Sequence, residues 1–382
     1  MADIKSLADK YEPYIIERRH YFHMHPELSM EEKLTAARIK GFLGANTNLS
    51  IVDRGEWFYA FKKGKRGETK IAFRADMDAL PIAEDEALSY HSKNPGVSHK
   101  CGHDGHCAAL CGLALELDGR ETEADIYLIF QPGEETGSGA VLCRELIKEE
   151  GIQRIFAFHN LSGYPEGSIV YRPGLTQPAS EGLKICFHGK TSHASAPEDG
   201  NNPSEVVANV ILRAAQLSKD QSAGMLLCTV TGIRLGSGDF GISPGEAEIC
   251  MTLRAEEESR MKSLEEGIVA FAGEEGERRG IRISYSVHDY FPETRNDEEC
   301  LKAALAAAEG LGLRRIPMDK MWRASEDFGW YLKECPGAII YIGSGEEHPP
   351  LHTAEYDFND RILETAVDLF ADLSVLNAED SV

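Results

Sequence analysis

The densest group of reactive side chains in the chain is Cys101-Gly102-His103-Asp104-Gly105-His106. A thiol and two imidazoles fall close together there, and the two glycines let the backbone turn them toward one point. Thiolate and imidazole together favour a borderline or soft divalent metal over Mg²⁺ or Ca²⁺. The alternative interpretation is a free thiol beside a helix-capping Asp104 and surface histidines.

A second reactive group is the acidic pair Glu134 and Glu135, which directly follows the apolar run 126–130 and Gln131-Pro132-Gly133. Adjacent side chains that leave a strand end point in different directions. One carboxylate can therefore bind a metal while its neighbour faces a bound water as general base. A solvated turn is the alternative, but open α/β sheets build their sites at the carboxyl ends of strands.

Two further histidines occupy similar places: His159 ends an apolar run, and His352 lies in a proline-rich loop after another. Each alone is more typical of a hydrogen-bonded core or loop residue. With Cys101, His103 and Glu135 they make five ligands of mixed N, S and O type, too many for one structural zinc site. Five such ligands beside a spare carboxylate are the donor set of a two-metal hydrolase.

The elements that must position these residues alternate between short apolar runs and helical stretches, which predicts an α/β sheet with helices on its faces. Ser29 and Glu32 predict a capping box at the start of the second helix. The predicted strands are 57–61, 71–74, 126–130, 155–159 and 339–342, and the predicted helices are 3–22, 30–43, 105–117, 138–149, 298–309 and 361–376.

The middle of the chain has a different pattern, in which two predicted helices and four predicted strands follow the order β-α-β-β-α-β. This order is typical of a ferredoxin-like α+β domain. The predicted elements are 181–188, 203–217, 226–234, 246–254, 259–279 and 281–290. We therefore expect a small domain at residues 179–291, inserted into a larger α/β domain made of residues 1–178 and 292–382.

Composition limits the kinds of partner. The 382 residues carry 40 Lys and Arg against 63 Asp and Glu, a net charge of −23, with a mean hydropathy of −0.31. Such a negative surface repels phosphate backbones and anionic lipid, which argues against nucleic-acid and membrane partners. The first twenty residues lack the apolar stretch of a signal peptide, and the nine cysteines are scattered. We therefore expect a cytoplasmic protein with reduced thiols.

Together these motifs make the chain resemble the M20 metallopeptidase family. Within it, the chain is most similar to the amidohydrolase branch of hippurate hydrolases, indole-acetyl-amino-acid hydrolases and N-acyl-amino-acid deacylases. The resemblance rests on residues 101–106 and 130–135, and on Arg74-Ala75-Asp76-Met77-Asp78-Ala79-Leu80-Pro81 and Ser325-Glu326-Asp327-Phe328. These motifs occur in the family's order and cover nearly the whole chain.

The resemblance implies two divalent metal ions, Zn²⁺ or Mn²⁺, with Co²⁺ or Ni²⁺ as alternatives. It implies that Glu134 is the general base and that Asp76 orients a metal ligand, with a loop cap as the alternative for Asp76. Arg74 stands where many members carry a metal-binding histidine, and this branch recruits Cys101 instead. The ligands that it implies are Cys101, His103, Glu135, His159 and His352.

The inserted domain resembles the lid of this family, which mediates dimerisation, so we expect a homodimer. His193 matches the lid histidine that polarises the scissile carbonyl, and Arg254 matches the arginine that binds the substrate carboxylate. A loop histidine and a strand-end salt bridge are the alternatives. Gly241 stands where relatives usually carry an asparagine, which removes a substrate hydrogen bond that they make.

We therefore expect a metal-dependent amidohydrolase that hydrolyses N-acyl amino acids. A dipeptidase or an N-acetyl-diaminopimelate deacetylase is the alternative within the family. A catalytically silent binding protein, or a cysteine amidase that uses Cys101 with His103, is the alternative from another class. A thiol nucleophile would survive metal removal, which separates the amidase from a metalloenzyme.

Overall fold

The computed structural model describes residues 5–84 and 87–376. These residues divide into two compact units. The first contains the chain up to Thr176, residues 294–321 and the chain from Glu326 onward. The second contains Gln177–Glu293 and Trp322–Ser325. The expected inserted domain, residues 179–291, lies within the second unit.

The first unit is built on an eight-stranded sheet with the order β1-β2-β4-β3-β5-β16-β6-β15. Its four central strands, β4, β3, β5 and β16, are parallel to one another. Their residues are almost all buried, as in sheets that carry helices on both faces. The strands are β1 (Ser50–Asp53), β2 (Phe58–Lys62), β3 (Lys70–Asp76), β4 (Asp125–Gln131), β5 (Arg154–Ser162), β6 (Ile169–Tyr171), β15 (Arg315–Pro317) and β16 (Gly337–Gly345).

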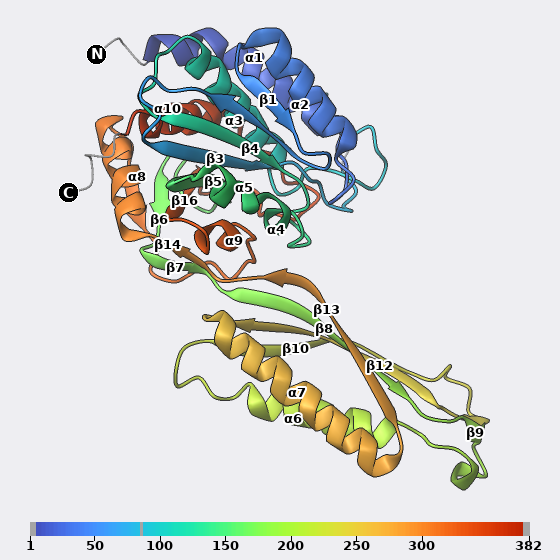
Figure 1. Ribbon diagram of the computed structural model, residues 1–382. Helices are drawn as coiled ribbons and strands as arrows, with labels where there is room; N and C mark the ends of the chain where they lie inside the picture. Colours follow the sequence, from blue (N-terminus) through green and yellow to red (C-terminus); the bar gives the residue numbers. More distant parts are fainter. Residues whose placement is uncertain (1–4, 85–86, 377–382) are drawn as a thin grey trace. The chain divides into compact units, whose positions relative to one another are not determined.

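Helices cover both faces of this sheet, and the strand residues alternate between the two layers (Figure 1). Phe73 of β3 packs in the layer of the long helices, while its neighbour Ala72 packs in the layer of the short ones. This alternation follows from the two-residue period of a strand. The first layer has α1 (Lys5–His23), α2 (Lys33–Asn46), α3 (His103–Asp118), α8 (Glu298–Gly310) and α10 (Leu363–Leu373), and the second has α4 (Ala140–Cys143), α5 (Glu145–Glu150) and α9 (Gly329–Leu332).

The second unit has a four-stranded antiparallel sheet with the order β10-β12-β8-β13. Two helices pack on one face around Ile185, Ile249 and Ile268, and the chain order is β-α-β-β-α-β, the ferredoxin-like arrangement. The elements are β8 (Ala179–His188), α6 (Ser204–Leu217), β10 (Leu226–Leu235), β12 (Glu246–Ala255), α7 (Glu258–Arg279) and β13 (Arg282–Phe291). The smaller elements of the chain are β7 (Gly174–Gln177), β9 (Ser192–His193), η1 (Pro197–Asp199), β11 (Ile242–Ser243), β14 (Thr294–Asn296) and η2 (Asp360–Ile362).

The predicted capping box at Ser29 is wrong. Helix α2 begins at Lys33, and its N-cap residue Glu32 makes no capping hydrogen bond. The Glu27 carboxylate accepts from the N–H groups of Leu34 and Thr35 in the first turn. The Ser29 hydroxyl donates to Asp78 Oδ2 at 2.7 Å instead. The Glu32 carboxylate accepts from the backbone N–H of Gly133 at 2.7 Å. Distant partners have thus replaced the local hydrogen bonds that the motif predicts.

Two predicted helices also differ from the structure. The stretch 138–149 forms two short helices, α4 and α5, which meet at Arg144. The stretch 361–376 begins as the 3₁₀ turn η2 and ends as helix α10 at Leu373. Among the described residues, 5–84 and 87–376, we find no helix that is both long and apolar enough to cross a bilayer.

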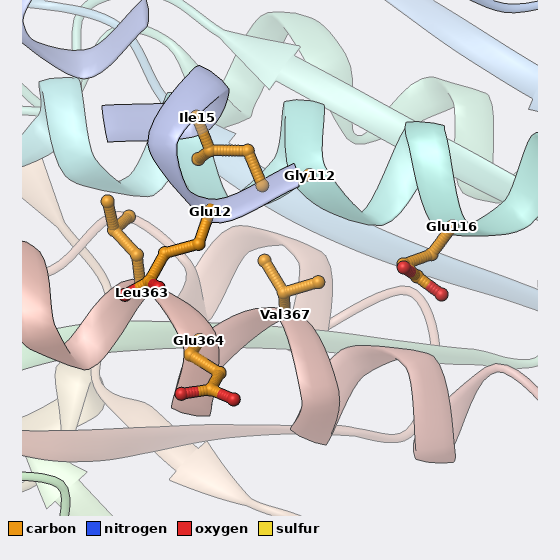
Figure 2. A pocket seen from close by; sticks show the side chains of 7 residues that line it. All are labelled: Glu12, Ile15, Gly112, Glu116, Leu363, Glu364 and Val367. Atoms are coloured by element: carbon orange, nitrogen blue, oxygen red, sulfur yellow. The ribbon is translucent and has the colours of Figure 1, made fainter. Parts of the chain in front are cut away.

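Helices α1, α3 and α10 meet at Gly112, beside a cavity of about 10 Å³ lined by apolar side chains and three glutamates (Figure 2). A cavity of this size is at the lower limit for one water molecule, so it is a packing gap and no ligand site. A Cβ atom at Gly112 would lie 2.6 Å from Val367 Cγ2 and 2.8 Å from Ile15 Cδ1. The glycine therefore sets how closely the three helices pack.

Gly112→Ala is expected to lower the free energy of unfolding by about 1–2 kcal/mol, because overpacking outweighs the better helix propensity of alanine. Gly41→Ala is the control: Gly41 lies in α2, and the space that its new methyl group would fill has no atom within 4 Å. That variant should gain about 0.5–1 kcal/mol. Urea denaturation measures both, and a stabilised Gly112→Ala protein would contradict the packing argument.

Candidate metal centre

Five side chains of the first unit converge on one point. Ligand atoms of Cys101, His103 and His159 all lie within 4.8 Å of one another, and so do those of Cys101, Glu135 and His352. The thiol belongs to both groups. Two overlapping groups of three ligands are the layout that a pair of neighbouring metal ions requires. The structure thus brings together all five residues that the sequence indicates as ligands.

The sheet explains this convergence, because the carboxyl ends of its parallel strands lie along one edge. His159 lies in the second half of β5, Glu135 follows the end of β4, and His352 lies in the loop after β16. Cys101 and His103 come from the start of α3, beside the same edge. Residues far apart in sequence therefore meet at one place.

Local backbone geometry turns Cys101 and His103 inward. Gly102 between them has φ +99°, and a Cβ there would lie 2.4 Å from Asn160 Oδ1. Only glycine fits this conformation and this space. His352 has φ +63°, uncommon for a residue with a side chain, and its N–H donates to the Lys100 carbonyl at 2.8 Å. This hydrogen bond holds the His352 loop beside Cys101.

Unpaired polar atoms show that the group fits a metal. His103 Nε2 and Glu135 Oε1 are buried without a hydrogen-bond partner among the described residues, and they lie 3.8 Å apart. His352 Nε2 lies 3.5 Å from the same Glu135 oxygen, and Cys101 Sγ lies 3.4 Å from His159 Nε2. Buried polar atoms without partners are costly. A cation among them would satisfy these lone pairs.

One ring nitrogen of His103 is paired with a carboxylate and a carbonyl group, which is the usual arrangement of a metal-binding histidine. Its Nδ1 lies 3.1 Å from Asp78 Oδ1 and 3.0 Å from the Asp78 carbonyl, which leaves Nε2 for a ligand. Burial alone would lower the pKa of His103, but Asp76, Asp78 and Glu135 raise it to about 10. The field at this position therefore favours positive charge, which a divalent ion supplies. Asp78, the residue that orients this ligand, was not predicted from the sequence.

Asp76 makes other contacts. Its Oδ1 lies 2.5 Å from His106 Nδ1, and its Oδ2 lies 3.7 Å from His103 Nε2. Burial opposes ionisation, but the Arg74 guanidinium and then the two histidines hold the pKa of Asp76 well below its usual range. His106, whose role the sequence left open, lies between Asp76 and Asn160 Oδ1 at 2.7 Å. Asp76 thus connects Arg74 to a buried histidine behind the ligands.

Glu134 is the carboxylate left over beside the ligands. It is 5 % exposed, and its Oε2 lies 4.0 Å from His103 Nε2. Burial is the largest cause that raises its pKa well above the usual value, followed by the carboxylates of Glu326, Glu135 and Asp327. A carboxylate with a raised pKa can both accept and return a proton near neutral pH. This is the property that a general base needs.

The carboxylates of Asp76, Glu326 and Asp327 form an acidic wall beside the ligand groups. Arg74 is the cation that they surround. It is fully buried, and its Nη1 lies 2.7 Å from Asp76 Oδ2. Its Nη2 lies 2.8 Å from Asp327 Oδ1 and 3.1 Å from Glu326 Oε1. Its Nε donates to Gln131 Oε1 at 2.8 Å. Arg74 therefore ties β3 to the end of β4 and to the 326–327 segment.

The second unit holds the other two predicted residues. His193 is exposed on β9, and its Nδ1 accepts from the N–H of Ser195 at 3.1 Å. Arg254 on β12 donates through Nη1 to the Arg323 carbonyl and to Ser325 Oγ, both at 3.0 Å. Within the described part of the chain no carboxylate pairs with Arg254, so most of its donors stay available to an anion. Burial lowers its pKa.

One polar cluster was not predicted from the sequence. His23 ends α1, and its acidic partners are not among its neighbours in sequence. In the fold its Nδ1 lies 2.8 Å from Asp104 Oδ2, and its Nε2 lies 2.8 Å from Glu84 Oε1. Both partners are more than sixty residues away. Their pairing fixes α1 against the start of α3, next to His103.

The three-layer fold and the two-metal ligand geometry define a metal-dependent hydrolase, and comparisons with known proteins identify its family. Residues 72–375 match the model of peptidase family M20/M25/M40, and the chain belongs to this family. It is therefore a hydrolase that acts on amide bonds.

Relatives extend along the whole chain. An N-acetylcysteine deacetylase of Bacillus subtilis is 30% identical, with 98% of this chain and 99% of that protein covered. A hippurate hydrolase of Campylobacter jejuni is 31% identical, with 94% of each covered. The crystal structure of a dinuclear metal-binding peptidase of family M20 from Bacillus subtilis superimposes with a TM-score of 0.79 at 27% identity. It covers 96% of this chain and 98% of that one. The ligand groups and this neighbour together support a site for two divalent ions.

Asp78→Ala is expected to lower metal affinity about 10- to 100-fold, because His103 loses the carboxylate that orients its ring. Competition with a chromophoric chelator measures the affinity. Asp53→Ala is the control, since Asp53 is an exposed residue paired with Lys40 on the surface. Equal affinities of the two variants would remove Asp78 from the site.

Proposed function

We propose that the protein hydrolyses the amide bond of N-acyl amino acids, with Glu134 as the general base. The observation that carries this proposal is the buried carboxyl group of Glu134, which lies outside the two ligand groups that share Cys101 but next to Glu135 and His103. Burial and the neighbouring carboxylates raise its pKa, which makes it a stronger base than an ordinary carboxylate. The family of the chain supplies the reaction class, and the residues around Glu134 supply its steps.

Five residues would hold the two ions, for which we propose Zn²⁺ or Mn²⁺, with Co²⁺ or Ni²⁺ as alternatives. When bound, such ions polarise the amide carbonyl and lower the pKa of water. Their mixed donor set of thiolate, imidazole and carboxylate suits these metals better than Mg²⁺ or Ca²⁺. The residues are Cys101, His103, Glu135, His159 and His352.

The proton steps belong to Glu134. Its carboxylate takes a proton from the attacking water, and the resulting carboxyl group returns it to the nitrogen of the leaving amine. Asp78 keeps the His103 ring in place during both steps. Arg74 stays charged beside Asp76, Glu326 and Asp327, so this wall holds its hydrogen bonds while Glu134 changes charge.

The second unit completes the proposal. We propose that His193 stabilises the oxyanion of the tetrahedral intermediate and that Arg254 binds the free carboxylate of the substrate. We also propose that this unit is a lid that mediates a homodimer, with His193 acting within one protomer or across to its partner. The protein has a net charge of −23 and repels an anionic substrate, so binding needs a local positive charge such as that of Arg254. We also propose a cytoplasmic location.

Two relatives support the substrate class. One is the B. subtilis protein named for deacetylation of N-acetylcysteine, and the other is the C. jejuni protein named for hydrolysis of hippurate. Both named substrates carry an acyl group on the α-nitrogen of an amino acid. A dipeptidase and an N-acetyl-diaminopimelate deacetylase are alternatives of the same chemistry. A panel of acyl amino acids, dipeptides and N-acetyl-diaminopimelate distinguishes them.

Glu134→Gln is expected to retain bound metal and substrate affinity while kcat falls about 10²- to 10⁴-fold, because the amide cannot take the proton. Initial rates with hippurate and metal analysis of the same sample measure this. Glu56→Gln, on an exposed loop residue, is the control. Full activity of Glu134→Gln would refute the assignment. A wild-type protein that binds acyl amino acids without turnover would favour the silent binding protein.

Arg254→Met is expected to raise KM for hippurate about 10- to 100-fold, because a charge-assisted hydrogen bond to the carboxylate is lost. The rate with an uncharged amide of hippurate should stay close to that of the wild type. Arg234→Met, also on the sheet of the second unit, is the control. Equal losses with both substrates would mean that Arg254 does not read the carboxylate.

A further inference from the structure

Glu32 lies at the start of α2, outside the ligand groups, and its carboxylate is almost completely buried at 3 % exposure. No cation within salt-bridge distance pairs with it in the described part of the chain. Its Oε1 accepts two backbone hydrogen bonds, from Gly133 N at 2.7 Å and from Met30 N at 3.0 Å. A buried carboxylate without a cation is costly, so its position requires an explanation.

The explanation lies in the turn that it contacts. Gly133 precedes the proposed base Glu134, and Glu135 follows it. The N–H of Gly133 donates to Glu32, and the N–H of Glu135 donates to Asp78 Oδ2 at 2.9 Å. The two amides on either side of Glu134 are therefore each held by a carboxylate from another part of the chain.

The turn needs such external acceptors because its own conformation is tight. Gly133 has φ +58°, and a Cβ there would lie 2.5 Å from Met30 Sδ. Its carbonyl accepts from the N–H groups of Ser138 and Gly139, both at 3.1 Å. These bonds close the loop through the carbonyl of Gly133. The N–H of the same residue donates outside the loop, to Glu32.

We propose that Glu32 is a positioning residue for the reaction, which holds the turn Gly133–Glu135 so that Glu134 faces the ligands. The inference rests on the proposed function, since it assigns Glu134 as the base. The Met30 side chain packs against Gly133, and Met30 itself has φ +66°. The segment from Met30 to Glu32 thus contacts the turn Gly133–Glu135 through both the Met30 side chain and the Glu32 carboxylate.

The charge of Glu32 matters less than its oxygen. Burial, and next the nearby Asp78 carboxylate, raise the pKa of Glu32 to about 7, while the backbone hydrogen bonds lower it. A neutral side chain with an oxygen at the same place should therefore also accept the hydrogen bond from the Gly133 N–H. Glutamine keeps that oxygen in place, whereas alanine removes it and aspartate withdraws it by one methylene.

The experiment compares four variants of the metal-loaded enzyme. Glu32→Ala is expected to lower kcat about 10- to 100-fold with KM unchanged, because a small displacement of the base is costly in rate. Glu32→Gln should stay within about threefold of the wild type, and Glu32→Asp should resemble Glu32→Ala. Glu31→Ala, the exposed neighbour, is the matched control.

Hydrogen–deuterium exchange separates a local effect from a general loss of stability, because a general loss would also speed exchange in other buried peptides. The peptide that contains Gly133–Glu135 should exchange faster in Glu32→Ala, and as slowly as wild type in Glu32→Gln and Glu31→Ala. Unchanged exchange, or unchanged kcat in Glu32→Ala, would overturn the inference. If Glu32→Ala does not fold, Glu32→Asp decides by the same two measurements. A wild-type enzyme without amidase activity would instead refute the proposed function and leave the exchange result to stand alone.

Discussion

One buried guanidinium holds the acidic side of the centre together. Arg74 uses Nη1, Nη2 and Nε to bind Asp76, the 326–327 segment and Gln131. Removing one partner of a buried ion pair strongly destabilises a protein, because the other charge is left buried and unpaired. The positions of these segments therefore depend on Arg74. The Arg74 side chain thus joins three segments around the proposed base, Glu134.

This arrangement also affects the proposed base, Glu134. Burial, and next the negative charge of several carboxylates around one cation, raise the pKa values of Glu134 and Glu326 and raise that of Asp327 to about 7. Removing the proton from Glu134 would add a further charge to an already negative wall. Burial of Glu134 among these carboxylates therefore gives it its affinity for a proton, which the positive charge of Arg74 partly offsets.

The order of elements and the ligand types could be predicted from sequence, because buried strands appear as apolar runs and the Cys, His and Glu ligands follow them. The short edge strands could not, since three or four residues carry too little periodicity. The capping box failed because Ser29 and Glu32 bind partners 49 and 101 residues away, which no local pattern contains. The supporting residues of the site are hidden for the same reason. Asp78 is ordinary in sequence, and only the fold shows that its carboxylate reaches His103 Nδ1.

Cys101 belongs to both groups of candidate ligands, so the proposed centre depends on the redox state of a single sulfur. A thiolate that gains oxygen becomes a sulfenic and then a sulfinic acid, and neither keeps the donor character of the original sulfur. One oxidised atom would therefore disturb both metal positions together. Burial shields this sulfur from bulk oxidants, so the packing around α3 protects the chemistry as well as the fold.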